Sequence, residues 1–187
     1  MAEHIVGIAV LAAGLSRRFG AEDKLLMPIQ GKPMLTHVLQ AASGHPHTQV
    51  CAVVSQKETE DLCRKMQIAT VVNPHPQKGQ SSSVSLGVQQ LSHCSGILFL
   101  PGDMPFLTQE IVDRIITRFR RDPAKITAGF DGSRYSPVLF PKTEFSTLMS
   151  LTGDTGGRIL LQGKKDCITT VSVPSHQLQD IDTKEDL

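Results

Sequence analysis

The sequence predicts an α/β protein in which a mostly parallel β-sheet is covered by helices on both faces, a three-layer α/β/α sandwich. Two observations predict it: short apolar runs alternate with segments of helical period, and two of these runs, 5–11 and 96–100, contain no polar residue. Strands of a parallel sheet that are buried on both faces have this continuous apolar character. Ligands of such folds bind at the carboxyl ends of the strands, so site residues are expected there.

The strands are expected where the apolar runs lie, at residues 5–11, 49–54, 69–72, 96–100 and 126–130, followed less regularly by 135–140 and 168–173. One helix is expected after Pro33 and ends before Gly44, which is the usual asymmetry of proline and glycine at helix ends. A second starts at the candidate N-cap Thr108 and stops at Asp122-Pro123. A third carries Val84, Val88 and Leu91, and shorter helices are expected at 144–151 and 156–162.

Length and charge limit the class of protein. The chain has 187 residues and a formal net charge of +1, and it contains no linker or repeat, so a single domain over residues 1–187 is expected. Binders of DNA or RNA usually carry a strong basic excess or an aromatic stacking surface. Here aromatic residues are only 4% and Trp is missing. A nucleic acid partner is therefore not expected.

The N-terminus and the cysteines indicate the compartment. Residues 1–4 lack the basic segment of a signal peptide, and no stretch reaches 18 apolar residues, so neither export nor a membrane partner is expected. The four cysteines are far apart and form no CxxC pair, which is typical of a reducing compartment and gives no support to zinc. The sequence therefore predicts a cytoplasmic protein.

The first apolar run leads directly into a loop of small and basic residues. After Leu11, the small residues Ala12, Ala13 and Gly14 allow close backbone approach to a ligand, and their amides can face phosphate oxygens. Ser16, Arg17, Arg18 and Lys24 follow. The spacing matches neither a Walker A loop nor the GxGxxG fingerprint. A glycine-rich turn with solvated basic residues is the alternative.

A carboxylate follows the apolar run at 96–100. Asp103 stands directly beyond the expected strand, where it needs a cation partner. Mg²⁺ is suited to that position, because it is usually held by one or two carboxylates together with substrate phosphates. The alternative is that Asp103 only shapes a turn between two prolines.

Two further segments carry weaker signals. Gly79 to Ser83 contains small residues and hydroxyls that could hold a base or ribose, although a serine there could instead cap the following helix. Asp180 and Asp182 alternate along an expected extended segment, so either could complete a metal shell. Alternatively, Asp182 or Thr183 caps a final helix that starts at Lys184.

Taken in order along the chain, these motifs resemble the MobA-like nucleotidyltransferases, and within them the molybdenum cofactor cytidylyltransferase (MocA-like) branch. The resemblance implies a Rossmann-like nucleotidyltransferase fold and transfer of a cytidylyl group from CTP to molybdopterin carrying molybdenum, with release of pyrophosphate. It implies catalytic roles for Arg18, Lys24 and Asp103 and a Mg²⁺ site at Asp103 and Asp182, with Asp180 as the other candidate. The implied nucleotide-binding residues are Leu11, Ala12, Ala13, Gly14, Ser16, Arg18, Lys24, Gly79 and Ser83.

The implied roles agree with simple chemistry. Departure of pyrophosphate develops negative charge, which Arg18 and Lys24 can stabilise. No general base is demanded, because a phosphate monoester is largely dianionic at neutral pH. Guanylyl-transferring members of the resembling family tend to have Gly where this chain has Ala13, so the methyl group is expected to favour cytosine.

The acceptor side is the least defined. Ser136, Asp154 and Arg158 lie in segments that resemble acceptor-binding family loops, although Ser136 stands where the family commonly has His. Three alternatives stay open: guanylyl transfer to molybdopterin, nucleotidyl transfer to a sugar or alcohol phosphate, and a non-catalytic escort of the cofactor. A molybdoenzyme or its chaperone is a possible partner.

Overall fold

A computed structural model describes residues 4–14, 23–164 and 167–182 of the chain. Within them seven strands form one sheet in the order β5-β4-β1-β6-β8-β7-β9. Strand β1 (Val6–Ala12) pairs in parallel with β4 (Thr48–Val54) and with β6 (Gly96–Pro101), and β5 (Ala69–Val72) extends this half in parallel.

The other half of the sheet contains the antiparallel strand. β8 (Tyr135–Pro141) runs antiparallel to β6 and to β7 (Ile126–Phe130), and β9 (Ile168–Ser172) pairs in parallel with β7. The predicted mostly parallel sheet is therefore confirmed. Because β8 is reversed, its first residues lie beside the end of β6, at the edge of the sheet where ligands bind in open α/β folds.

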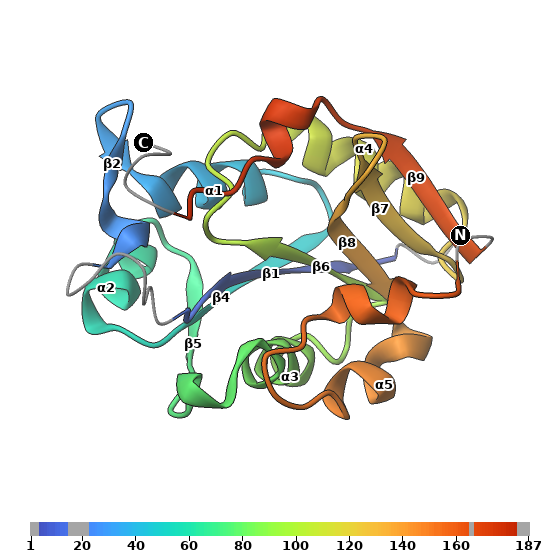
Figure 1. The fold of residues 1–187 in the computed structure, drawn as a ribbon, viewed down its shortest axis with the longest axis horizontal. Coiled ribbons are helices and arrows are strands. Elements are labelled where there is room, and N and C mark those ends of the chain that lie inside the picture. The colour runs from blue at the N-terminus through green and yellow to red at the C-terminus, as the bar shows by residue number, and fades with distance from the viewer. Residues whose placement is uncertain (1–3, 15–22, 165–166, 183–187) are drawn as a thin grey trace.

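Helices cover both faces of the sheet, as the three-layer prediction requires (Figure 1). On one face lie α1 (Met34–Ala42), α2 (Lys57–Lys65) and α4 (Gln109–Arg121), and on the other α3 (Gln80–Gln90) and α5 (Phe145–Met149). The pleat of β1 divides the core: Val6, Ile8, Val10 and Ala12 pack toward α1 and α4, whereas Ala9 packs toward α3.

Two differences from the sequence-based expectation have a physical cause. Residues 69–72 were expected to be buried on both faces, but they form the edge strand β5, where Val72 is 52% exposed. The apolar pattern does not specify α2, because this helix buries only Thr59 and Cys63 and carries charged pairs such as Lys57 with Asp61 on its exposed side.

Shorter elements complete the chain. A hairpin of β2 (Pro28–Ile29) and β3 (Lys32–Pro33) turns through Gln30 and Gly31, both of which have positive φ. The segment expected to be helical at 156–162 is a 3₁₀ helix, Gly157–Leu161, and further 3₁₀ turns lie at Lys24–Leu26, Pro76–Lys78, Lys142–Glu144 and Ser175–Leu178. In the described ranges, none of the helices has the length and apolar character needed to cross a bilayer.

The cysteines yield a first prediction. Burial raises the pKa of Cys51 to about 12 and that of Cys63 to about 11, and it also raises the pKa of Cys94. Cys167 is exposed. Because the thiolate is the reactive form, we expect a thiol-specific disulfide reagent at pH 8 to modify only Cys167 in the folded protein and all four cysteines after unfolding. Cys167→Ser should then abolish the reaction of the folded protein, and fast reaction of a second thiol contradicts the prediction.

Candidate functional site

A cavity of about 640 Å³ opens at the carboxyl ends of β1 and β6, the edge where the fold class predicts a ligand. Its walls come from six parts of the chain: the end of β1, the turn at Lys24, the segment from Pro76 into the start of α3, the turn after β6, the loop of Gly153 and Asp154, and Asp182. The lining residues are Leu11, Ala13, Gly14, Lys24, Leu25, Pro76, Gln77, Lys78, Gly79, Gln80, Ser83, Pro101, Asp103, Gly153, Asp154 and Asp182.

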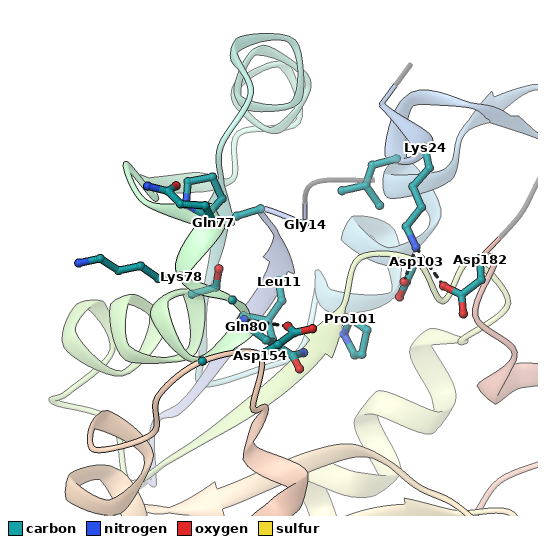
Figure 2. A pocket seen from close by; sticks show the side chains of 16 residues that line it. Leu11, Gly14, Lys24, Gln77, Lys78, Gln80, Pro101, Asp103, Asp154 and Asp182 are labelled. Atoms are coloured by element: carbon teal, nitrogen blue, oxygen red, sulfur yellow. Dashed lines mark hydrogen bonds and ion pairs between the residues drawn. The ribbon is translucent and has the colours of Figure 1, made fainter. Parts of the chain in front are cut away.

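One side of the cavity is organised around Lys24. Its ammonium group donates to Asp103 Oδ2 at 2.8 Å, to the carbonyl oxygen of Ile181 at 3.1 Å and to Asp182 Oδ1 at 3.4 Å. An ammonium group has three N–H donors, so all of them are engaged. Figure 2 shows the three side chains of Lys24, Asp103 and Asp182 turned toward one another.

Asp103 is positioned by the end of β6. The N–H of Gly102 donates to the carbonyl oxygen of Leu11 at 3.0 Å, which joins the turn to β1. A side chain at Gly102 would approach that same oxygen to 2.9 Å, so the turn requires a glycine. The carbonyl oxygen of Asp103 accepts from the N–H of Ile181 at 3.0 Å. Asp103 therefore does more than shape a turn: it joins Lys24 to the segment that ends at Asp182.

Lys24 belongs to the 3₁₀ turn Lys24–Leu26, and a carboxylate fixes this turn. Asp23 Oδ1 accepts from the N–H of Leu25 at 3.0 Å, the usual role of an N-capping carboxylate. Its second oxygen, Oδ2, accepts from the hydroxyl of Thr59 at 2.6 Å. The base of the Lys24 side chain is thus tied to the first turn of α2.

The opposite side of the cavity is the start of α3. Gly79 has φ +87° and ψ −176°, a conformation that is accessible mainly to glycine. A Cβ atom there would lie 2.5 Å from the backbone of Gly153 and Asp154. The side chain of Ser81 donates to the carbonyl oxygen of Gly153 at 2.7 Å, so the loop around residue 153 is docked on the helix.

The first N–H of α3 has a capping partner from far along the chain. Asp154 Oδ1 accepts from the N–H of Gln80 at 3.2 Å. No serine caps the helix: Ser82 donates to the carbonyl oxygen of Gly79, and Ser83 is fixed by the buried Asn73, which donates to it at 3.0 Å. The alternative in which a serine caps this helix is therefore wrong.

The structure brings together most of the predicted nucleotide-binding residues. Leu11, Ala13, Gly14, Lys24, Gly79 and Ser83 all line the cavity, and so do Asp103 and Asp182. Ala12 is the exception: its side chain is 2% exposed and packs in the core beneath α1, on the opposite face of β1. Ser16, Arg17 and Arg18, together with Thr183 and Lys184, lie outside the described residues.

The three predicted acceptor residues do not meet at one cavity. Asp154 lines the main cavity, whereas Arg158 lines a second hollow of about 360 Å³ with Arg134 and Tyr135. Ser136 is 3% exposed, and its hydroxyl donates to the sulfur of Met104 at 3.5 Å. The buried hydroxyl of Ser136 is therefore turned toward the core.

The two aspartates of the C-terminal segment have different partners. Asp182 faces Lys24, but Asp180 forms a two-point ion pair with Arg134, at 2.8 and 3.1 Å. Partial burial alone would raise the pKa of Asp180, but the hydrogen bonds and charge of Arg134, with the nearby charge of Arg158, outweigh it and hold this pKa below its ordinary value. The carboxylate of Asp180 is thus paired with Arg134, and Asp182 is the aspartate that lines the main cavity.

The charges of the cavity bear on what it can hold. Of the described lining residues, two are lysines and three are aspartates. In the part of the chain that the structure describes, no group of three or more His, Cys, Asp or Glu side chains is arranged to hold a metal ion. However, Asp103 and Asp182 present oxygens within 3.4 Å of one nitrogen atom, so two carboxylates converge on a position occupied by positive charge.

Sequence reasoning missed the residues around Gly79. Pro76, Gln77 and Lys78 line the cavity, yet no motif distinguished them. Lys78 lies on the rim with its side chain directed away from Lys24 (Figure 2). The available signal was position alone, since these residues follow β5 and so lie at the carboxyl edge of the sheet.

Substitution of Gly79 tests the docking of the two loops. We expect Gly79→Ala to lower the free energy of unfolding by about 1–3 kcal/mol, because its backbone conformation is unfavourable for alanine and the added methyl group meets the backbone of Gly153. Gly132→Ala is the matched control: its φ is +104°, but a Cβ there has no neighbour within 4 Å. Urea unfolding of both variants measures the difference, and equal loss in the two contradicts the proposed contact.

Known proteins with similar sequences include two classes of nucleotidyltransferase. A probable molybdenum cofactor guanylyltransferase of Pyrococcus horikoshii is 36% identical over 114 residues, which are 59% of this chain and 55% of that protein. A 2-C-methyl-D-erythritol 4-phosphate cytidylyltransferase of Dehalococcoides mccartyi is 28% identical over 134 residues, 69% of this chain and 53% of that protein. The chain spans about half the length of these curated relatives.

Solved structures share the fold. Rv0371c from Mycobacterium tuberculosis H37Rv superposes with a TM-score of 0.81 at 23% identity, covering 100% of this chain and 96% of that one. Molybdopterin-guanine dinucleotide biosynthesis protein A from Archaeoglobus fulgidus gives a TM-score of 0.70 at 17% identity, covering 96% and 94%. The predicted Rossmann-like nucleotidyltransferase fold is thus confirmed. A family model described as MobA-like NTP transferase domain matches residues 8–168, and the chain belongs to this family, as its motifs predicted.

Proposed function

We propose that this protein transfers a nucleotidyl group, with CTP as the favoured donor, to a phosphorylated acceptor of the molybdopterin type. The observation that carries the proposal is the cluster of Lys24, Asp103 and Asp182 in a cavity at the carboxyl edge of the sheet. The names of similar proteins support nucleotidyl transfer in molybdenum cofactor biosynthesis. A pure escort is disfavoured, because storage of a cofactor does not require a lysine held between two carboxylates.

A nucleoside triphosphate is compatible with the shape of the cavity. Gly14, which has no side chain, leaves the backbone of this wall open to close approach by phosphates or ribose. On the other wall Ser83, held by Asn73, contributes a fixed hydroxyl for the base or ribose. Arg18 is proposed to add a second cation for the phosphates, in line with the family motif.

Mg²⁺ fits the acidic side of this cavity. Asp103 and Asp182 would hold it, because carboxylate oxygens with substrate phosphates are the ligands that Mg²⁺ prefers. When bound, the ion supplies positive charge that neutralises the phosphates of the donor. The described lining residues include three aspartates and two lysines, so a divalent cation would offset part of the negative charge that a triphosphate brings, which supports the proposed Mg²⁺.

The proposed reaction is an in-line exchange at the α-phosphorus. An oxygen of the acceptor phosphate forms a bond to the α-phosphorus of CTP, the bond from that phosphorus to the bridging oxygen of the β-phosphate breaks, and pyrophosphate leaves with the electron pair. Lys24, once it exchanges its carboxylate partners for phosphate oxygens, stabilises the negative charge that develops on the leaving group. No residue has to remove a proton, because the acceptor is already dianionic.

Similar proteins differ in the nucleobase of the group that their names say they transfer, which is guanine in some and cytosine in others. Ala13 is 4% exposed and lines the cavity, so its methyl group narrows the pocket where a base would lie, which favours cytosine. GTP is the second candidate, because several relatives are named molybdenum cofactor guanylyltransferases.

The acceptor is proposed to extend from the cavity toward the second hollow. Two segments connect the cavity with the hollow. In the first, Asp154 lines the cavity and Arg158 lines the hollow. In the second, Asp182 lines the cavity and Asp180 pairs with Arg134, which lines the hollow. A guanidinium group is suited to oxygen-rich groups of an acceptor. Asp154 and Arg158 thus remain acceptor-binding candidates, and Ser136 acts at most through its neighbour Met104.

Release of pyrophosphate from each of four nucleoside triphosphates, with molybdopterin and Mg²⁺, tests the function and the choice of base together. We expect release to depend on the acceptor and to be faster with CTP than with GTP, and Ala13→Gly to reduce that preference by opening the pocket. Comparable rates with both donors contradict the role of Ala13. Absence of release with every donor contradicts the proposed function.

Lys24→Met tests the metal site without relying on turnover alone. Removal of the ammonium group takes away one cation that competes with a metal ion for Asp103 and Asp182, so we expect Mg²⁺ or Mn²⁺ to bind several-fold more tightly in the absence of nucleotide. Turnover should fall about 100-fold or more, since the leaving group loses its stabilising charge. Asp103→Asn is the opposite control and should weaken metal binding. Unchanged metal affinity in both variants, measured by titration calorimetry, contradicts this assignment of the ligands.

A further inference from the structure

We infer that Thr59 is a positioning residue for Lys24, acting from helix α2 through Asp23. The inference rests on the proposed function, in which Lys24 stabilises the leaving pyrophosphate. Thr59 lies outside the cavity and touches neither Asp103 nor Asp182 through any contact that the structure describes. Its effect on the reaction must therefore pass through the turn that carries Lys24.

The connection consists of two hydrogen bonds to one carboxylate. The hydroxyl of Thr59 donates to Asp23 Oδ2 at 2.6 Å, and the N–H of Leu25 donates to Asp23 Oδ1 at 3.0 Å. Lys24 lies in sequence between the two residues that this carboxylate links, Asp23 and Leu25. Leu25 is itself 4% exposed and packs in the core, so the turn has one apolar anchor and one polar anchor.

The burial of Thr59 is informative because α2 is otherwise largely solvated. Only Thr59 and Cys63 of this helix are buried, and both are 0% exposed. Burial of a hydroxyl is unfavourable unless the group is hydrogen bonded, and valine would fill the same space without that requirement. The described partner that offsets this cost is Asp23. Thr59 also stands in the first turn of α2, where the helix dipole favours a carboxylate.

The position of Lys24 depends on this anchor most when substrate is bound. In the structure its ammonium group is held by Asp103, Asp182 and the carbonyl oxygen of Ile181. In the proposed reaction the ammonium group leaves these oxygens for phosphate oxygens, and a long flexible side chain then loses three of its restraints. The turn that Asp23 and Thr59 fix then remains as the restraint on the backbone of Lys24. Loss of the Thr59 hydroxyl should therefore affect kcat more than the binding of the donor.

Thr59→Val in the full chain tests this inference. We expect kcat for pyrophosphate release to fall about tenfold, as for the loss of one buried hydrogen bond, while KM for the nucleoside triphosphate stays within about twofold. Thr59→Ser keeps the hydroxyl and should recover most of the lost kcat. Thr127→Val is the matched control, since Thr127 is 1% exposed and its hydroxyl has no hydrogen-bond partner among the described residues. If Thr59→Val does not fold, Asp23→Asn removes the same charged link and should give the same loss of kcat.

An equal kcat in Thr59→Val and wild type, or an equal fall in Thr59→Ser or Thr127→Val, overturns the inference. Failure of the proposed function is a separate result, because the wild type then releases no pyrophosphate with any donor. In that case the ε-methylene NMR signal of Lys24 in the ligand-free protein, identified by its loss in Lys24→Arg, decides the matter. We expect this signal to shift in Thr59→Val and to stay in place in Thr127→Val, and an unchanged signal in Thr59→Val overturns the inference.

Discussion

The ion pair between Lys24 and Asp103, 2.8 Å long, is the contact on which the rest of the site depends. Lys24 comes soon after strand β1, Asp103 follows β6, and the third partner, the segment of Ile181 and Asp182, follows the edge strand β9. These segments meet because β1 and β6 pair in parallel and end at the same edge of the sheet. A single ammonium group therefore joins the beginning, the middle and the end of the described chain, and it does so on one side of the cavity.

The antiparallel strand β8 explains why the site has a second region. A parallel strand at this position would bring its carboxyl end to the ligand edge, but β8 brings its first residues there. Arg134 and Tyr135 thereby reach the hollow that Arg158 also lines, and Arg134 fixes Asp180 only two residues before Asp182. Under the proposed function, donor residues gather on the parallel half of the sheet, and the acceptor candidate Arg158 lies toward the mixed half.

The sequence predicted the sheet, the presence of helices on both of its faces and most of the residues that line the cavity, because each of these has a local signal. Uninterrupted apolar runs mark β1 and β6, and Asp103 was recognisable from its position just beyond such a run. Contacts between distant segments had no local signal. The cap that Asp154 provides for α3, the pairing of Asp180 with Arg134 and the link from Thr59 to Asp23 each join residues more than 30 positions apart. Likewise, Ala12 and Ala13 are the same residue type in one motif, and only the pleat of β1 determines which of them faces the core and which the cavity.

The loop that caps α3 through Asp154 reaches both the main cavity and the second hollow. The loop that caps the helix contributes Gly153 and Asp154 to one wall, and four residues later it supplies Arg158 to the neighbouring hollow. A ligand that moved this loop at one end would change the energy of binding at the other, and thermodynamic linkage would make the influence mutual. A single loop of polar and glycine residues thus contributes to the walls of both the hollow and the cavity.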